Sequence, residues 1–247
     1  MTVHLGLALP SFVEDPEIPI EVARAAEAAG LDGVFVYDHL WRGDPPNRRP
    51  ALECFALLGA VAAETSRIHV GTLVARATLR PPATLANALA TAERISNGRL
   101  IAGIGSGDSE SRAENEAFGL PFGTMADRID ALHDSVRACR LQGYPVWVGG
   151  LGRAVREIVA IADGWNGWGS DPELFASEIE LVREVAPEAV ITWGGLARPL
   201  EEGAEALAAR LVPYPALGAT WIIIGPVDSS NPDNAGVLRE VRDRLRQ

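Results

Sequence analysis

The 247-residue chain contains no lysine, and all 22 of its basic residues are arginine. Enzymes that form a Schiff base with a substrate or with pyridoxal phosphate need a lysine amine. The Walker A loop of nucleotide-binding proteins also depends on a lysine. The sequence therefore excludes these chemistries.

Cysteine is scarce and net positive charge is lacking. Cys54 and Cys139 lie in predicted helices, without the spacing of metal ligands or of a disulfide framework, so we predict no metal. A net charge of −11 disfavours nucleic acid and anionic membranes as partners. No apolar run approaches the roughly 20 residues of a membrane span, and the first residues lack a signal-peptide pattern. We expect a cytoplasmic protein with a small-molecule substrate.

Short apolar runs alternate with helical segments along the whole chain. Several of the apolar runs are continuous, as in strands that helices cover on both faces. Strands are predicted at 3–9, 33–37, 68–74, 100–104, 145–148, 164–167, 189–193 and 219–224. Helices are predicted at 16–29, 52–64, 84–95, 125–140, 154–161, 174–185, 201–211 and 235–246. This order predicts one (β/α)8 TIM-barrel domain over residues 1–247, with a doubly wound open sheet as the alternative.

An acid, an imidazole and an indole follow the second predicted strand. In parallel barrels, chemistry takes place at the carboxyl ends of the strands. We therefore interpret Asp38 and His39 as catalytic and Trp41 as a substrate contact, with His39 as the proton-transfer group. The alternative is a loop in which Asp38 only bonds local backbone. The proline-rich segment 42–50 could cover this site, or it could be a plain surface loop.

Alternating glycines end the fourth predicted strand. Gly105, Ser106 and Gly107 would let the backbone approach a ligand closely, and Asp108 follows as a second candidate acid or base. Asp108 could instead cap the helix that comes after it.

Two further strand ends carry groups that could bind anions. After the fifth strand, Gly149 and Gly150 present backbone N–H groups and Arg153 adds a charged donor, which suits a phosphate. After the third strand, Arg76 could contact an anionic substrate. We interpret Arg80 as a solvated loop arginine.

Five segments together resemble the bacterial luciferase-like superfamily over about the first two-thirds of the chain. They are residues 33–39, 68–72, 96–107, 145–150 and 162–165. The Asp-His pair and the Gly-Ser-Gly-Asp turn are more similar to the branch that uses the deazaflavin coenzyme F-420 than to the FMN-dependent monooxygenases.

The resemblance implies a deazaflavin ring against the carboxyl ends of strands two to four. The histidine matching His39 would lie beside the reacting carbon, oriented by neighbours such as Asp38, and Asp108 would match an acid of relatives that oxidise sugar phosphates. A non-proline cis peptide at Leu73-Val74 would form a bulge under the ring. The implied cofactor-binding residues are Thr72, Leu73, Val74, Gly105, Ser106, Gly107, Gly149, Gly150 and Arg153.

The chain departs from this family pattern in one place. Relatives usually carry an insertion before strand five, whereas here Arg140 leads to Pro145 within a few residues. The shorter segment would leave a more open pocket, admit a bulkier substrate or weaken cofactor binding. The sugar-phosphate dehydrogenases have glutamate where Asp108 stands, so their substrate is not carried over.

We predict an oxidoreductase that moves a hydride between coenzyme F-420 and a small organic substrate. One alternative is an FMN-dependent monooxygenase of the same family, served by a separate reductase that supplies reduced cofactor. Another is a flavin-binding barrel without turnover. A homodimer is a family expectation.

Overall fold

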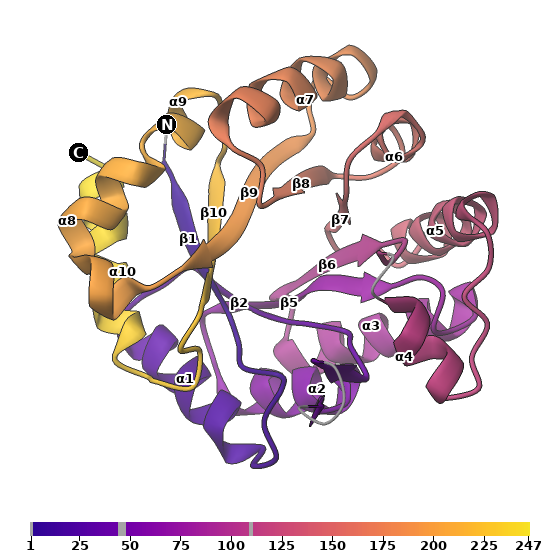
Figure 1. Cartoon of the computed structure of the whole chain (residues 1–247), viewed down its shortest axis with the longest axis horizontal. Helices are drawn as coiled ribbons and strands as arrows, with labels where there is room; N and C mark the ends of the chain where they lie inside the picture. Colours follow the sequence, from indigo (N-terminus) through magenta and orange to yellow (C-terminus); the bar gives the residue numbers. More distant parts are fainter. Residues whose placement is uncertain (1, 44–47, 109–110) are drawn as a thin grey trace.

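Eight parallel strands close into a barrel, and helices surround it (Figure 1). The computed structural model describes residues 2–43, 48–108 and 111–247. Around the barrel each strand pairs with its neighbours in the order β1-β2-β5-β6-β7-β8-β9-β10, and β10 returns to β1. The strands are β1 (His4–Ala8), β2 (Gly33–Val36), β5 (His69–Arg76), β6 (Leu100–Gly105), β7 (Val146–Gly149), β8 (Gly164–Trp168), β9 (Val190–Ala197) and β10 (Trp221–Pro226). The TIM-barrel prediction is confirmed, and the open sheet is wrong.

The helices begin and end where local sequence signals favour it. The side chain of Asp171 accepts a hydrogen bond from the Leu174 amide and Pro172 follows in the first turn, while Asn97 ends α3 in the left-handed conformation. The helices are α1 (Glu17–Ala28), α2 (Cys54–Glu64), α3 (Pro82–Ser96), α4 (Ser111–Ala117), α5 (Met125–Arg140), α6 (Arg153–Val159), α7 (Pro172–Val185), α8 (Pro199–Leu211), α9 (Pro213–Ala216) and α10 (Asn234–Leu245). The short helices α4 and α9 were not predicted.

Large side chains fill the barrel interior. Strand residues alternate between the inside of the barrel and the helix layer. Val34 and Val36 accordingly join the cluster shared with the helices, whereas Phe35 belongs to a separate buried cluster with Trp147 and Trp221. Trp221 meets the Phe35 ring edge-on at 6.0 Å and the Trp147 ring at 5.5 Å. The interior is therefore packed, and hollows that could bind a ligand occur at the barrel mouth.

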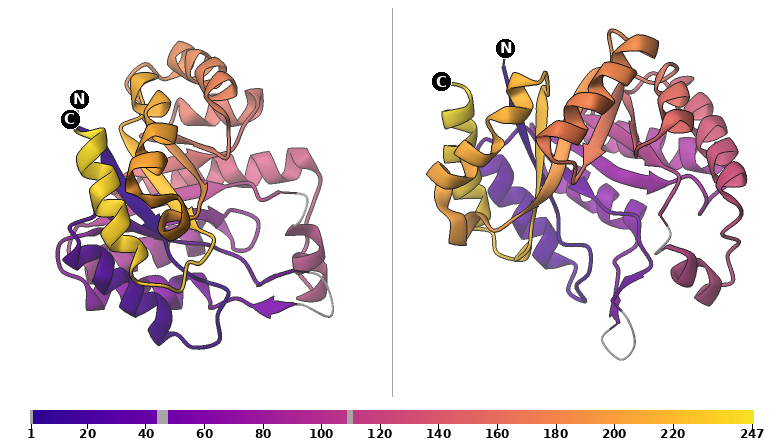
Figure 2. Two further views of the ribbon diagram at one scale, coloured as in Figure 1. Left: turned by 60° about the vertical axis from the view of Figure 1, so that its left-hand side comes forward. Right: turned by 45° about the horizontal axis from the view of Figure 1, so that its top comes forward.

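Two connections shape that mouth. After β2 the chain forms an antiparallel hairpin of β3 (Trp41–Arg42) and β4 (Arg49–Pro50), which extends away from the barrel (Figure 2). Our prediction of a cover over 42–50 falls partly outside the described residues, because 44–47 are not among them. The link from α5 to β7 spans only residues 141–145, as the sequence suggested. Among the described residues, no helix is both long and apolar enough to cross a membrane.

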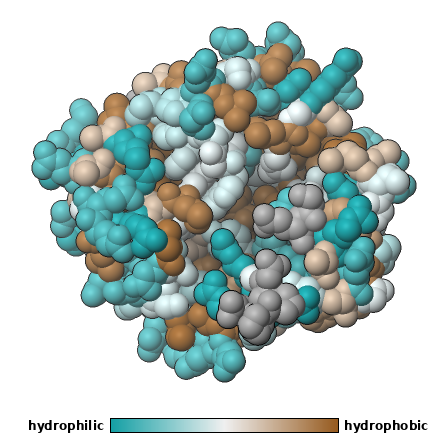
Figure 3. Space-filling model, viewed as in Figure 1, coloured by the Kyte–Doolittle hydropathy of each residue, from teal (hydrophilic) through white to brown (hydrophobic). Residues whose placement is uncertain are grey.

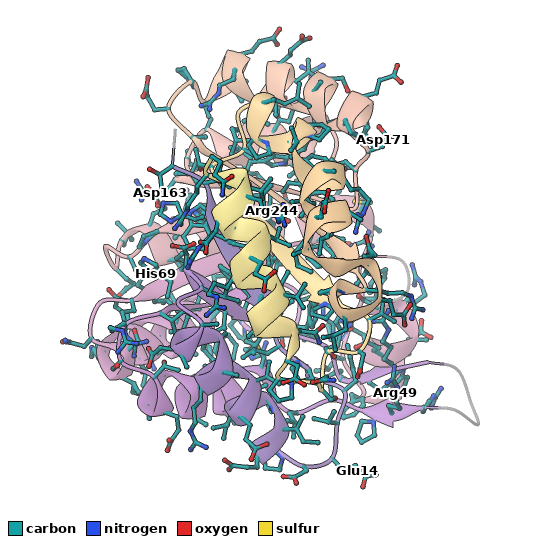
Figure 4. The ribbon with its side chains drawn as sticks, turned by 90° about the vertical axis from the view of Figure 1, so that its left-hand side faces the viewer. Glu14, Arg49, His69, Asp163, Asp171 and Arg244 are labelled. Carbon is teal, nitrogen blue, oxygen red and sulfur yellow. The ribbon has the colours of Figure 1, made fainter. Side chains whose placement is uncertain are left out.

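The two ends of the barrel carry different groups. His69 begins β5 and Asp163 directly precedes β8, and both lie at the end opposite Arg49 of the hairpin (Figure 4). The hairpin thus marks the carboxyl end of the strands, where chemistry is expected.

Glu27 connects helix α1 to the segment that leads into strand β5. Its carboxylate accepts hydrogen bonds from the amides of Ser66, Arg67 and Ile68, which lead into β5. Burial opposes ionisation, but these backbone hydrogen bonds lower the pKa of Glu27 from 4.5 to about 2. We expect Glu27→Ala to reduce the free energy of unfolding by about 1 to 2 kcal/mol at neutral pH.

The same interaction predicts a pH dependence. Because the folded pKa lies below the unfolded one, the carboxylate stabilises the protein above about pH 4.5 and this contribution is lost as the pH falls toward 2. The stability difference between wild type and Glu27→Ala should therefore shrink over that range in urea titrations. A difference that stays constant down to pH 2 would contradict the assignment.

Candidate active site

The barrel mouth is hollowed by a cavity of about 310 Å³. In the space-filling view the molecule is hollowed at this mouth, between pale and apolar residues (Figure 3). We call this hollow the central cavity, and it is lined by Tyr37, Asp38, His39, Leu73, Val74, Arg76, Gly105, Ser106, Gly107, Asp108, Ser111, Gly149, Gly150, Asn166 and Trp168. The structure therefore brings together most of the residues that the sequence selected from strands two to five.

Asp38 is bound to arginines and does not orient His39, which corrects the sequence-based role. Its carboxylate accepts two hydrogen bonds from Arg80, at 2.7 and 3.1 Å, and one from the Arg76 amide at 2.9 Å. Asp38 and His39 both line the central cavity, but their side chains have different partners. Arg80 is also no solvated loop residue, because its side chain is 19% exposed and also binds Glu53.

Glu114 of α4 is the group that orients His39. Its Oε1 lies 2.7 Å from Nδ1 of His39, and its Oε2 accepts the Leu40 amide at 2.8 Å. Burial opposes ionisation of Glu114, but the hydrogen bonds from His39 and Leu40 and the charges of His39 and Arg76 lower its pKa overall. An ionised carboxylate only accepts, so Nδ1 carries a proton and Nε2 remains available for chemistry.

Arg76 is buried between the two carboxylates instead of being presented to a substrate. Its Nε donates to the Asp38 carbonyl at 2.7 Å, and its guanidinium also contacts Glu114 and Asn115, each at 3.2 Å. Only 2% of Arg76 is exposed, and Asp38 and Glu114 are equally well buried. Arg76 therefore links the end of β2, the end of β5 and α4.

Asp108 takes the capping role that the sequence left open. Its Oδ1 accepts the amide and the hydroxyl of Ser111, each at 2.9 Å, at the start of α4. Burial opposes ionisation, but these bonds and the charges of His39 and Arg76 lower the pKa of Asp108 overall. These bonds account for Asp108 as a helix cap, and its role as a catalytic acid or base stays a prediction.

Val74 forms part of the cavity floor and fits between two glycines. The Leu73-Val74 peptide is cis, as the resemblance implied, and the β5–β6 register shifts between Thr72 and Ala75. A Cβ at Gly105 would lie 2.5 Å from Val74, and one at Gly149 would lie 2.7 Å away. These glycines therefore leave room for the valine and also line the cavity.

Three of the predicted cofactor or substrate contacts do not line the central cavity. Thr72 is fully buried and donates its hydroxyl to the Gly103 carbonyl, so it belongs to the barrel wall. Arg153 begins α6, 86% exposed, and pairs with Glu157 on the same helix. Trp41 lies on the hairpin, where the Arg48 guanidinium stacks on its ring at 3.9 Å. Trp41 lines an outer groove beside His39 instead of the central cavity.

Sequence reasoning missed several residues of the site. Glu114 lies 75 residues from His39 in the chain, in a polar segment. It reaches the imidazole because it lies on the short helix α4, which begins at Ser111. Tyr37 and Trp168 meet edge-on, with ring centroids 6.1 Å apart, and line the opposite wall. Asn166 donates to Thr192 at 2.7 Å beneath them. Within the described part of the chain, no cluster of potential metal ligands is present.

The histidine–carboxylate pair and the glycine-lined hollow both lie at the carboxyl end of a closed parallel barrel. TIM-barrel enzymes have their active sites at this end. The family model for luciferase-like monooxygenases matches residues 10–198. The chain belongs to this family.

Known relatives share parts of the sequence or the whole fold. The F-420-dependent glucose-6-phosphate dehydrogenase of Amycolatopsis mediterranei is 38% identical over 128 residues, which are 51% of this chain and 37% of that enzyme. An uncharacterized protein of Mycobacterium bovis is 26% identical over 285 residues, covering 98% of this chain and 99% of its own length. The chain thus spans little more than a third of that dehydrogenase.

Solved structures match along the whole chain. An F-420-dependent secondary alcohol dehydrogenase in complex with an F-420–acetone adduct aligns with a TM-score of 0.83 and 16% identity, covering 100% of both chains. The coenzyme F-420-dependent tetrahydromethanopterin reductase of Methanopyrus kandleri aligns with a TM-score of 0.75 and 15% identity, covering 97% of this chain and 98% of that one. At these identities the likeness shows the fold.

The fit of Val74 against Gly105 is directly testable. We expect Gly105→Ala to lower the free energy of unfolding by about 1 to 3 kcal/mol, because the new methyl group would overlap the valine. In a Val74→Ala background the same change should cost clearly less. Gly59→Ala in α2 is the control, since its nearest neighbour lies 3.9 Å away. Equal costs for Gly105→Ala in both backgrounds, measured by urea denaturation, would contradict this packing.

Proposed function

We propose that the chain is an oxidoreductase that transfers a hydride between coenzyme F-420 and a small organic substrate. The observation that carries the proposal is the His39–Glu114 pair, which faces a cavity with Val74 and glycines at its floor. The sequence similarity to F-420-dependent glucose-6-phosphate dehydrogenases supports the same cofactor.

The cavity residues suit a flat ring that carries a phosphate-bearing tail. Gly105, Gly107, Gly149 and Gly150 keep the wall free of side chains, and Val74 offers an apolar surface. We propose that the ring lies against Val74 and that Gly149, Gly150 and the exposed Arg153 bind the tail phosphate. When bound, the deazaflavin supplies or accepts the hydride, and the protein contributes orientation and proton transfer.

His39 is proposed to move the proton that accompanies the hydride. When an alcohol carbon loses a hydride its hydroxyl loses a proton, which Nε2 of His39 can accept, and carbonyl reduction returns it. Glu114 holds Nδ1 protonated and stabilises the positive charge that the imidazole then gains. We assign positioning roles to three residues that support the His39–Glu114 pair: Asp38, Arg76 and Arg80. Homodimerisation and a separate reductase stay predictions.

Cofactor binding tests the proposal directly. We expect the purified protein to bind F-420, in its oxidised or reduced form, and to leave FMN unbound when cofactor fluorescence and absorbance are followed. Tight binding of FMN alone would replace the proposal by the monooxygenase alternative. Binding of neither cofactor would favour the barrel without turnover.

Variants of the histidine pair test the proton-transfer role. His39→Ala should reduce turnover by about 10²- to 10⁴-fold while F-420 still binds. Glu114→Gln keeps a hydrogen-bond acceptor but removes the charge that stabilises the imidazolium. It should lower turnover less than His39→Ala and move the pH profile to lower pH.

Glu116→Gln is the matched control, because it removes a charge from the same helix α4, on an exposed side chain that pairs with Arg112. It should shift the pH profile less than Glu114→Gln does. Full turnover in His39→Ala, or equal shifts in the two carboxylate variants, would overturn these roles.

A further inference from the structure

A second hollow lies beside the central cavity, between β1 and the hairpin. This hollow, which we call the side cavity, has a volume of about 280 Å³. Its walls come from the loop after β1, the β3–β4 hairpin, Leu196 of β9, and Pro226 at the end of β10 with the segment 227–230 that follows. Tyr37 lines both cavities. A molecule in the side cavity would therefore contact the same side chain that borders the central cavity.

Two arginines reach the side cavity from the hairpin. Arg42 and Arg49 are directly opposed in the antiparallel register, so their side chains leave the hairpin on the same face. Like charges in that arrangement destabilise a two-stranded ladder. Neither residue is among the arginines that form ion pairs in the described part of the chain. The two positive charges are thus placed to meet an anion in the cavity.

The remaining walls combine apolar surface with polar groups. Leu196 is 52% exposed and Val227 is 50% exposed, so both offer apolar area to a ligand. Ser229 and Ser230 add hydroxyl groups, and Asp228 adds one carboxylate. Among the described lining residues, two arginines stand against this one carboxylate. The lining suits a molecule with a small carbon skeleton and an acidic group.

Tyr37 stands where the two cavities meet. A Cβ at Gly225 would lie 2.8 Å from the phenol oxygen, so this glycine makes room for the hydroxyl group over β10. Burial raises the pKa of Tyr37, so the hydroxyl keeps its proton at neutral pH and can donate to an oxygen. A substrate oxygen beside Tyr37 would lie at the border of the central cavity.

We propose that the side cavity is the substrate subsite and that it selects an organic anion. Arg42 and Arg49 would bind a carboxylate or a phosphate monoester, while the apolar walls hold the carbon skeleton and the hydroxyl or carbonyl group points to Tyr37. This assignment rests on the redox function proposed above, but its charge selectivity can be measured without the cofactor.

The test compares matched ligands on the cofactor-free protein. The anionic probes are 3-hydroxybutyrate and glycerol 3-phosphate, and 1,3-butanediol is the neutral counterpart. Dissociation constants are measured by ligand-observed NMR at about 0.15 M ionic strength, where long-range attraction is screened. We expect an anion to bind at least about tenfold more tightly than the diol, which is about 1.4 kcal/mol. The tighter of the two anions identifies the acidic group.

Charge-removal variants locate the binding. Arg42→Gln/Arg49→Gln should lose the anion preference, whereas Arg239→Gln/Arg244→Gln, which removes two exposed charges on α10, should keep it. Figure 4 shows Arg244 on that helix, away from the hairpin. Equal binding of the diol and the anions, no anion binding, or an unchanged preference in the hairpin variant would overturn the proposal.

A cofactor titration separates this proposal from the one on which it rests. If the hairpin variant loses F-420 affinity by more than about tenfold, the arginines bind the cofactor tail and the substrate subsite is wrong. If wild type fails to bind F-420, the redox function fails, while the anion measurements still decide the selectivity of the side cavity.

Discussion

The barrel mouth is organised by the need to neutralise buried charges. Asp38, Arg76 and Glu114 are each less than 5% exposed, and they come from the end of β2, the end of β5 and α4. Removing one partner of a buried ion pair typically costs several kcal/mol, because the other charge is left without compensation. Arg76 of β5 pairs with Glu114 of α4, and Asp38 pairs with Arg80 in the loop after β5, so ion pairs connect these segments. The imidazole of His39 is fixed by the same network, since Glu114 bonds Arg76 and His39 with its two oxygens.

The cavity floor depends on the same strand end. Val74 and Arg76 both belong to β5, so the residue that packs between Gly105 and Gly149 is two positions from the arginine that links the carboxylates. The β5–β6 register shifts between Thr72 and Ala75, and Val74 within this irregular stretch lines the central cavity. The end of β5 therefore supplies both the cavity floor, through Val74, and a hydrogen bond to Glu114, through Arg76.

The sequence predicts the strands well because buried parallel strands are continuous apolar runs, which local composition reveals. It also identifies strand ends that meet at one site, because His39 and Gly105 both line the central cavity. It fails for pairings that only the fold creates. Asp38 and His39 are adjacent, yet their partners are Arg80 and Glu114, 42 and 75 residues away. Glu114 lies on a seven-residue helix whose sequence gives no hydrophobic period.

The arginines at the barrel mouth differ in whether a carboxylate neutralises them, and this difference bears on which ligands the protein can bind. In a chain of net charge −11, an anionic ligand is repelled over most of the surface and needs a local concentration of positive charge. Arg76 and Arg80 cannot supply it, because carboxylates already neutralise them. Arg42 and Arg49, opposed on the hairpin, can. The buried Arg76 thus helps to position the imidazole, whereas the exposed Arg42 and Arg49 line the side cavity. Tyr37 lines both cavities.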